Sequence, residues 1–568
     1  MKYIRYSFFA ALLCAFCQMA VAQVRVKKLL KAPGLEIVYG HSYKGHQAPY
    51  RTTAIVVGDE VEVKTVASEM ADEGADNAMQ MAAYYDYRTM MVYDVATLPS
   101  GRRVSTAEAF TLGAGLTAVE GTERILGLQC QHLRAVHNSN TYDVWVTHEL
   151  PACNASPSNI ALCEGLVLRV VRNGDMVTEA TAIKPLAAAR QIIPTDRGEV
   201  MDAYEYRYAV NRAGVLDVRV FDQARVAFTG EKLPADVTAD EIYHAGGGTV
   251  VLRKVTLPEC SLGYNVYCTT TQYSDGDAYD RVGSVFVIPT ERKQSFLDML
   301  RDMSSVPAQR MGGEDYPGLI STADYAVPLE LQRFFTGFGV RAYNGRNRIP
   351  GVTWADSVTY KTDVTSLSSC LQGEVWLGAY VGNWDAKGHR LSVTLSYYPT
   401  GGERQYAAMP LFNTVNYAEQ AGQKYPTFML TDSLTTTFTL DHDVRDAVLY
   451  YLTSGHGGWG GGDEFNQKIN TIWLDGQKVA AFIPWRDDCA TYRSNNPCSG
   501  DAANGETSSD YSRSNWCPGT VTNPEYIALG DLKAGQHTLS VQIPQGAPEG
   551  GSNSYWCISG TLLYLPMP

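Results

Sequence analysis

Short runs in which apolar and polar residues alternate, separated by clusters of Gly, Pro, Asn and Asp, extend along most of this sequence. Examples are TTAIVV (52–57), EVEVKTV (60–66), GLVLRVV (165–171) and DAVLYYLTS (446–454). A period of two is typical of a strand with one buried face, and many short strands joined by turns favour sandwiches. We therefore predict an all-β chain. Helical patterns interrupt it at 75–86 (ADNAMQMAAYYD) and 290–303 (TERKQSFLDMLRDM). Asn173-Gly174, between the runs LVLRVVR and MVTEATAI, predicts a hairpin turn.

The chain of 568 residues is too long for one core, and its length suggests roughly three domains. Residues 1–22 have a basic start, an apolar run and an Ala-Val-Ala end, so we expect a signal peptide. We assign 23–193 to a small, mostly β accessory domain, 194–215 to a linker, and 216–400 and 401–568 to two further β domains. No later stretch approaches the ~20 apolar residues of a membrane helix. We expect an exported protein, secreted or periplasmic.

Composition excludes some classes of partner. The net charge of −13 argues against nucleic-acid binding, which normally requires a basic face. The 9 Trp and 35 Tyr suit β-sheets, and they also suit sugar sites in which a ring stacks on the apolar face of a sugar. Both interpretations stay open on composition alone.

Cysteine usage fits an oxidising compartment, because 10 of the 12 cysteines lie beyond the expected signal peptide. None forms the paired C-x-x-C pattern of a zinc site, and we expect no metal. The disulfides we favour pair Cys153 with Cys163, Cys260 with Cys268, and Cys489 with Cys517.

The stretch SGHGGWGGGDEF (454–465) matches the G-x-G-x-x-G spacing of a dinucleotide loop. The residues after it, FNQKINTIWLDGQKVAAFI, alternate and contain the turn Asp475-Gly476, so they predict a hairpin and not the helix that a phosphate site needs. Glycines let the chain bend sharply and approach a ligand closely. The loop could aim Glu464 into a cleft; the alternative is a tight loop with a solvated Asp463–Glu464 pair. We interpret His456 as a loop residue.

Two further segments carry candidate site residues. In YSDGDAYDRVGSVFV (273–287), Asp280 precedes a predicted strand, and its alternative role is a simple ion pair with Arg281. The order of the acids there does not fit a calcium loop. In SRSNWCPG (512–519), Arg513 and Trp516 adjoin Cys517, which indicates either a rigid polar and aromatic wall or a stapled surface loop.

Together these segments resemble the peptide-N-glycosidase F family of amidases that remove whole N-linked glycans. The resemblance covers about three fifths of the chain, from Leu216 to Pro568, and rests on five ordered blocks: CTTTQYSDGDAYDRVGSVFV, QRFFTGFGV, GEVWLGAYVGNWDAKG, the glycine stretch ending in Asp463-Glu464, and SRSNWCPG. It implies two adjacent eight-stranded antiparallel jelly-roll sandwiches with the active site in the cleft between them.

The resemblance also implies roles for individual positions. Asp280 matches the principal catalytic carboxylate and Glu464 the second one, with Arg281 beside the sugar. The positions that match the glycan cleft are Trp384, Trp459, Arg513 and Trp516. The pairs Cys260–Cys268 and Cys489–Cys517 match family disulfides.

One position departs from the family pattern. Gly382 stands where the prototype has a further glutamate, so that acid is dispensable here, or Asp463 or another carboxylate replaces it. A missing side chain would enlarge the pocket around the innermost sugar. We therefore hypothesise tolerance of core-fucosylated glycans, including plant-type linkages.

The function expected is hydrolysis of the Asn side-chain amide of N-glycoproteins and glycopeptides, which releases the intact glycan and converts Asn to Asp. The reaction needs water, a base and a proton donor but no cofactor, and we expect a monomer. The alternatives are an endo-acting glycosidase that uses the same two acids, and a non-catalytic glycan-binding protein. A serine hydrolase is disfavoured because G-x-S-x-G is absent from the sequence.

Overall fold

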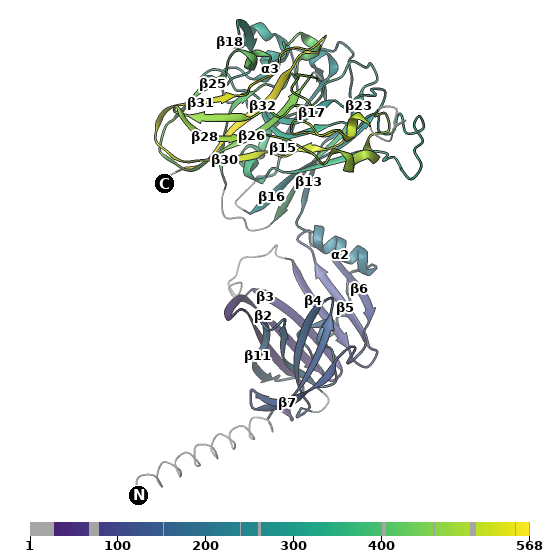
Figure 1. Cartoon of the computed structure of the whole chain (residues 1–568). Coiled ribbons are helices and arrows are strands. Elements are labelled where there is room, and N and C mark those ends of the chain that lie inside the picture. The colour runs from purple at the N-terminus through teal and green to yellow at the C-terminus, as the bar shows by residue number, and fades with distance from the viewer. Residues whose placement is uncertain are drawn as a thin grey trace. The chain divides into compact units, whose positions relative to one another are not determined.

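The protein, in a computed structural model, consists of two compact units, Met1–Gly214 and Val215–Pro568 (Figure 1). The described residues are 28–67, 79–150, 153–238, 240–259, 263–399, 405–457, 460–499, 507–550 and 552–566. The expected signal peptide lies outside them. Within the described ranges, no helix has both the length and the apolar character needed to cross a membrane.

The first unit is one 12-stranded sheet, in the order β12-β6-β5-β4-β3-β2-β1-β11-β10-β9-β8-β7. Only the β12–β6 pair is parallel. The strands are β1 Leu35–Tyr43, β2 His46–Val57, β3 Glu60–Ala67, β4 Gln80–Asp86, β5 Met91–Thr97, β6 Arg103–Ala109, β7 Thr117–Ile125, β8 Leu128–His137, β9 Asn140–Thr147, β10 Leu166–Arg172, β11 Met176–Pro185 and β12 Glu199–Val200. The 3-10 helix η1 is Asn159–Ala161.

Two local predictions in this unit have different outcomes. The turn at Asn173-Gly174 joins β10 to β11 with both residues at positive φ, as an Asn-Gly hairpin requires. The helix expected at 75–86 is wrong for its described part, because Gln80–Asp86 forms β4; residues 75–78 lie outside the described ranges. Tyr85 and Tyr84 belong to different apolar clusters, so β4 contributes to packing on both faces and its apolar run carries no clear period of two.

The segment 194–215, expected to be a linker, contains β12 and the helix α2, Ala203–Arg212. Asp202 caps this helix by accepting hydrogen bonds from the backbone N–H groups of Tyr204 and Glu205. Tyr206 packs with Ala96, Leu98 and Val104 of the sheet region. This segment is therefore part of the first unit.

The second unit contains two β-sandwiches, which confirms the all-β fold class. In the first sandwich a 4-stranded sheet, β13-β23-β16-β21, packs on a 6-stranded sheet, β14-β15-β22-β17-β20-β29. Its strands are β13 Leu216–Val226, β14 Tyr243–Ala245, β15 Val250–Leu257, β16 Tyr264–Ser274, β17 Val282–Ile288, β20 Leu329–Phe335, β21 Val358–Asp363, β22 Gly373–Val381, β23 His389–Pro399 and β29 Val521–Thr522. The first sandwich thus departs from the expected eight strands.

The second sandwich packs two 4-stranded sheets together, β24-β32-β26-β30 and β25-β31-β27-β28. Its strands are β24 Ala407–Asn413, β25 Leu434–Leu440, β26 Val444–His456, β27 Asn470–Leu474, β28 Gln477–Phe482, β30 Glu525–Leu532, β31 Gly535–Gln542 and β32 Tyr555–Pro566. The predicted hairpin turn Asp475-Gly476 joins β27 to β28.

Smaller elements decorate both sandwiches. They include the hairpin β18 Ala308–Met311 with β19 Glu314–Pro317, the helix α3 Phe296–Arg301, and the 3-10 helices η2 Gly246–Gly248, η3 Met303–Ser305, η4 Thr365–Cys370, η5 Glu419–Ala421, η6 Phe428–Leu430, η7 Cys489–Asn495 and η8 Ser508–Asp510. Helix α3 lies within the predicted segment 290–303 and begins with a capping box at Ser295.

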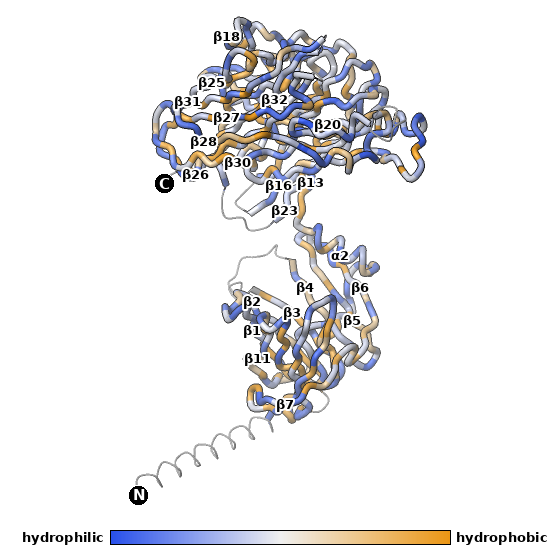
Figure 2. Tube along the Cα trace, in the orientation of Figure 1, coloured by the Kyte–Doolittle hydropathy of each residue, from blue (hydrophilic) through white to orange (hydrophobic). Residues whose placement is uncertain are grey.

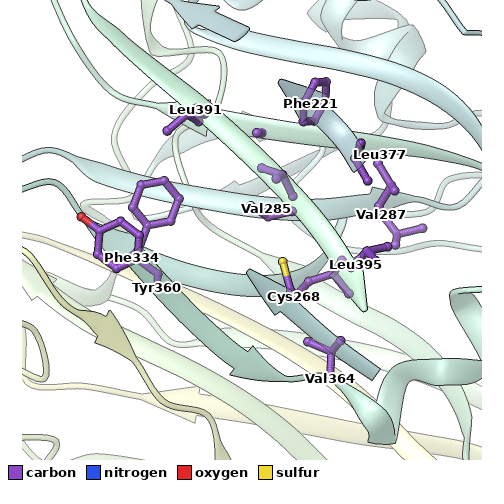
Figure 3. Packing of buried hydrophobic residues seen from close by; sticks show 14 of the residues in the cluster. Phe221, Cys268, Val285, Val287, Phe334, Tyr360, Val364, Leu377, Leu391 and Leu395 are labelled. Atoms are coloured by element: carbon purple, nitrogen blue, oxygen red, sulfur yellow. The ribbon is translucent and has the colours of Figure 1, made fainter. Parts of the chain in front are cut away.

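The core of the first sandwich is filled by side chains from both of its sheets (Figure 3). Phe334 of β20 stacks on Tyr360 of β21, with ring centroids 4.6 Å apart. Apolar and polar residues alternate along many strands (Figure 2), as expected where one face of a sheet is buried. Tyr450 and Leu452 of the second sandwich join this same core, so the two sandwiches share buried apolar surface.

Candidate active site

Asp280 and Glu464 come from different sandwiches and meet at one arginine. Asp280 lies just before β17, and Glu464 lies in the glycine loop that follows β26. Arg513 Nη1 donates to Asp280 Oδ2 at 3.3 Å and to Glu464 Oε1 at 2.9 Å. The side chains of the two acids are 16% and 22% exposed, and that of Arg513 is 1% exposed. The shared nitrogen holds both carboxylates at one place with limited access to solvent.

The surroundings of Arg513 fix its guanidinium in place. Its carbon Cζ lies 4.4 Å from the ring centroid of Trp516 and 4.8 Å from that of Phe465. Its backbone exchanges two hydrogen bonds with Arg486, and Nη2 donates to the carbonyl oxygen of Ser508. A cation held by rings and backbone in this way cannot follow the carboxylates, so the carboxylates orient on it.

Burial raises the pKa of Asp280 to about 7; the nearby Arg513 lowers it and the negative charge of Glu464 raises it. Burial also raises the pKa of Glu464, again opposed by Arg513. Burial therefore disfavours the ionised form of both acids, and Arg513 partly offsets this effect. Such a pair suits general acid and base catalysis.

Arg281 is not the ion-pair partner that its position in the sequence suggested. Its Nε donates to Asp277 Oδ2 at 2.7 Å and its Nη2 to Asp277 Oδ1 at 3.3 Å. His389 Nε2 lies 3.4 Å from the same Oδ2. Burial would raise the pKa of Asp277, but the hydrogen bonds from His389 and Arg281 outweigh it and lower the pKa to about 2. Asp277 therefore orients Arg281, and Asp280 is left to Arg513.

A cavity of about 360 Å³ opens beside the two acids. Trp384, whose side chain is 58% exposed, forms one wall, and Trp516, 3% exposed, forms another. Trp516 stacks on Phe335 at 4.4 Å and donates its indole N–H to the carbonyl oxygen of Gly455. The full lining is Asp280, Arg281, Val282, Phe335, Gly382, Trp384, Glu419, Tyr425, His456, Gly457, Glu464, Trp516, Ser552, Asn553 and Tyr555.

Gly382 lies on the cavity wall with little room for a side chain. A Cβ placed there would lie 2.6 Å from the hydroxyl oxygen of Tyr380, closer than real Cβ contacts allow. The space expected to be empty at this position is therefore partly taken up by Tyr380. Any larger residue at 382 would have to displace that buried hydroxyl.

Sequence reasoning did not identify Glu419, which contributes a third carboxylate to the cavity. It accepts a hydrogen bond from the hydroxyl of Tyr425, and burial raises its pKa while Tyr425, Arg281 and Trp384 oppose that shift. The signal that could have revealed it was weak, since NYAEQAG (416–422) is a short polar segment without a motif. Glu419 therefore joins Asp280 and Glu464 in the lining of the cavity, to which Gly382 also belongs.

Two predicted binding residues are placed elsewhere or fall outside the described ranges. Asp463 is fully buried and does not line the cavity; its Oδ1 accepts from the backbone N–H of residue 546 at 2.9 Å. Burial raises its pKa to about 6. Its contact shows a role in closing the glycine loop. Trp459 lies outside the described residues.

His456, expected in a loop, is the last residue of β26, and its imidazole lines the cavity. Residues 454 and 456 share one face of the strand, so Ser454 Oγ lies 2.9 Å from His456 Nε2. This pair does not form a serine nucleophile, because Ser454 is fully buried and does not line the cavity.

Of the three favoured disulfides, one is present. Cys489 and Cys517 are bonded, and they tie η7 to the segment that carries Arg513. The bridge between Cys153 and Cys163 is wrong: both are free, buried thiols that pack in different apolar clusters. Cys268 is also free and buried, so its expected bridge is not formed, and its partner Cys260 lies outside the described residues.

One group of potential metal ligands occurs in the described part of the chain, namely Asp488, Cys489 and Cys517. The two cysteines are consumed by their disulfide, so this group offers no thiolate to an ion.

Comparison with solved structures decides the family. PNGF-II in the P21 space group is 38% identical to this chain and has a TM-score of 0.85, over 94% of this chain and 100% of that one. The chain belongs to the peptide-N-glycosidase F family. PNGF-II in the C2 space group is 37% identical, with a TM-score of 0.75, over 94% of this chain and 98% of that one. A search of curated proteins finds no significant match.

Family models agree with this assignment along the chain. The model described as peptide-N-glycosidase F, N terminal, matches residues 217–397, and the model described as peptide-N-glycosidase F, C terminal, matches 424–563. The model described as the N-glycanase peptide, N-terminal domain, matches 37–208. Membership of the peptide-N-glycosidase F family makes the chain an N-glycanase.

Proposed function

We propose that this N-glycanase hydrolyses the side-chain amide that joins asparagine to the innermost sugar, releases the intact glycan and leaves aspartate. One observation carries the proposal: Asp280 and Glu464, from separate sandwiches, share Arg513 at the wall of a cavity with an exposed tryptophan. Trp384 offers a ring face for a sugar, and the acids supply proton transfer.

The chemistry needs three contributions at the amide. Asp280 takes a proton from water as the oxygen attacks the amide carbon, and its pKa near 7 suits that task at neutral pH. Asp280 then passes this proton to the leaving nitrogen, so the C–N bond breaks as the glycosylamine departs, and ionised Glu464 orients the amide. Arg513 lies within reach of both acids and stabilises whichever one is ionised.

Glu419 replaces the family glutamate that is missing at Gly382. It lies on the wall of the same cavity, close to Trp384, and Arg281 balances part of its charge. An ionised Glu419 would accept hydrogen bonds from sugar hydroxyls or from the N-acetyl N–H group. This assignment of the third acid favours Glu419 over Asp463, which is fully buried, does not line the cavity, and accepts from the backbone N–H of Gly546.

We further propose that core-fucosylated glycans are substrates, including those with plant-type linkages. Gly382 lines the cavity and projects no side chain into it, so a branch on the innermost sugar would meet no side chain from this position. The variant Tyr380→Phe with Gly382→Glu makes room for the glutamate and should cleave plain cores but spare fucosylated ones. Tyr380→Phe alone is the matched control, and it should cleave both.

The expected signal peptide at 1–22 and the disulfide Cys489–Cys517 support action in an oxidising compartment, outside the cytoplasm. The substrates are then extracellular glycoproteins and glycopeptides. We also propose that the enzyme acts as a monomer. Light scattering after size exclusion would report a dimer if a second chain were needed.

The experiment that tests the function is mass spectrometry of a defined glycopeptide digested in ¹⁸O-water. Amide hydrolysis yields a peptide in which aspartate carries one ¹⁸O, together with the whole glycan. An endo-acting glycosidase would leave a sugar on asparagine, and a binding protein would release nothing; either result would overturn the proposal.

A further inference from the structure

A buried ion pair joins the two sandwiches behind the cavity. Arg333 of β20 and Glu330 on the same strand are both fully buried, and Arg333 Nε donates to Glu330 Oε1 at 3.0 Å. Arg333 Nη1 reaches the second sandwich, where it donates to Ser454 Oγ at 3.3 Å and to the carbonyl oxygen of Cys557. Ser559 Oγ donates to Glu330 Oε2 at 2.6 Å.

The hydroxyl of Ser454 can be oriented from its two neighbours. Arginine only donates, so Ser454 Oγ must accept from Arg333. The hydroxyl proton then needs an acceptor, and His456 Nε2 at 2.9 Å is the other partner of Oγ in the described part of the chain. If Nε2 carried the hydrogen, the serine proton would be unpaired at a fully buried position, which is costly. Nε2 is therefore the unprotonated nitrogen.

The imidazole itself is held neutral. Burial, together with the charges of Arg333 and Arg513, lowers the pKa of His456 to about 3. The aromatic groups around it add no proton acceptor for the ring edge: Tyr555 stacks at 5.1 Å, and Phe335 and Trp516 lie at 5.6 and 5.5 Å. A neutral ring that accepts at Nε2 carries its hydrogen on Nδ1.

We propose that Arg333 and Ser454 are positioning residues that lock His456 as the Nδ1–H tautomer, so that it presents a hydrogen-bond donor to a carbonyl oxygen of the substrate in the cavity. The inference rests on the proposed function for the identity of that carbonyl, either the asparagine amide or the N-acetyl group. The tautomer itself follows from the buried network alone. Ser454 does not touch substrate, and it acts through the ring.

The first test reads the tautomer without any activity. Two-dimensional ¹H–¹⁵N spectra of the full chain labelled at its ten histidines distinguish a protonated from a bare ring nitrogen, and His456→Gln identifies the signal. We expect Nδ1 to be protonated and Nε2 bare from pH 5 to pH 8. Ser454→Ala should mix the tautomers, and Ser454→Thr, which keeps the hydroxyl, should preserve them. An Nε2–H ring or an imidazolium in the wild type would overturn the proposal.

The second test uses isosteres of the ring. Asparagine at 456 places an N–H near the position of Nδ1, whereas glutamine places one near Nε2. We expect His456→Asn to retain several-fold more kcat than His456→Gln, and Ser454→Ala to lose about tenfold in kcat with little change in KM, since a lost oxyanion donor costs ~10²–10³ at most. Equal activity of the two isosteres, with both folded by circular dichroism, would refute the role. If the chain releases no glycan at all, the proposed function fails while the tautomer result still stands.

Discussion

Arg281 is bonded to Asp277, four residues earlier, through two guanidinium nitrogens, although its immediate neighbour in the sequence is Asp280. Asp277 is 2% exposed and also contacts His389. The two aspartates therefore have different roles. Asp277 orients Arg281 at the cavity, whereas Asp280 lies beside Arg513 and has a raised pKa.

Asp277→Asn should therefore weaken both the fold and binding. Removing one partner of a buried charge pair costs roughly 3 kcal/mol, and here the partly exposed Arg281 is free to turn into solvent. The pKa of Asp277 is lowered to about 2, so its contribution to stability is complete above the unfolded pKa near 4 and is lost as pH falls toward 2. Urea titrations at pH 7 and pH 3 should show a smaller difference between variant and wild type at pH 3.

Asp280→Asn should lose at least ~10²-fold in kcat, because the base that takes the proton from water is gone. The thermal midpoint at pH 4 should stay within a few degrees of the wild type, since asparagine has nearly the same volume as the protonated carboxyl and is likewise uncharged. Glycan release from a fluorescent glycopeptide measures the first value and calorimetry the second. Wild-type turnover in this variant would remove Asp280 from the mechanism.

The pH profile of kcat/KM should rise through about pH 7, where Asp280 loses its proton. The negative charge of Glu464 helps to raise that pKa, so the residual activity of Glu464→Gln should rise at a lower pH than the wild type. Stopped assays between pH 5 and pH 9 check this. A limb that moves to higher pH would contradict the assignment of the base.

The stability of Asp280→Asn relative to the wild type should grow with pH. The folded pKa near 7 exceeds the ordinary 3.8, so the carboxyl of the wild type stays protonated in the fold while it ionises in the unfolded chain. The free energy of unfolding of the wild type is therefore highest below pH 4. It decreases by at most about 4 kcal/mol as the pH rises to about 7. The amide of the Asp280→Asn variant does not ionise, so the variant does not lose stability in this way. Guanidinium unfolding at pH 4 and pH 8 should show the difference, and equal differences at both values would refute the shifted pKa.

Trp384→Ala should raise KM about tenfold or more and change kcat little, since an exposed ring that stacks on a sugar supplies binding more than proton transfer. Tyr526, which is also exposed but does not line the cavity, offers a control in Tyr526→Ala. Michaelis curves for a short glycopeptide separate the two constants. A pure loss of kcat at Trp384 would place the ring in the chemistry.

The strand pattern allowed the all-β class, the hairpins at Asn173 and Asp475 and the segment of α3 to be predicted, because these depend on local periodicity and turn residues. Position 80–86 was mistaken for a helix since burial on both faces hides a period of two. The resemblance to the family motifs predicted Asp280 and Glu464 as site residues, and in the structure both accept hydrogen bonds from Arg513.

Other parts of the site depend on contacts that no local pattern encodes. The partner of Arg281, the approach of Glu419 and the inclusion of His456 in a strand follow from packing between distant segments. The bond between Arg333 and Ser454 spans 121 residues. The free thiols Cys153 and Cys163 show the same limit, because an even cysteine count does not specify pairing.

Strand β29 belongs to the second half of the chain by sequence and to the first sandwich by its pairing, since Thr522 lies opposite Arg333 and Val521 opposite Phe334. A protein truncated near residue 400 would lack β29, the edge strand of the six-stranded sheet. The edge of β20 would then be unpaired and open to pairing with other chains. Neither sandwich can therefore be moved to another protein by itself. A fusion protein that is to contain this active site therefore needs residues 215–566 together.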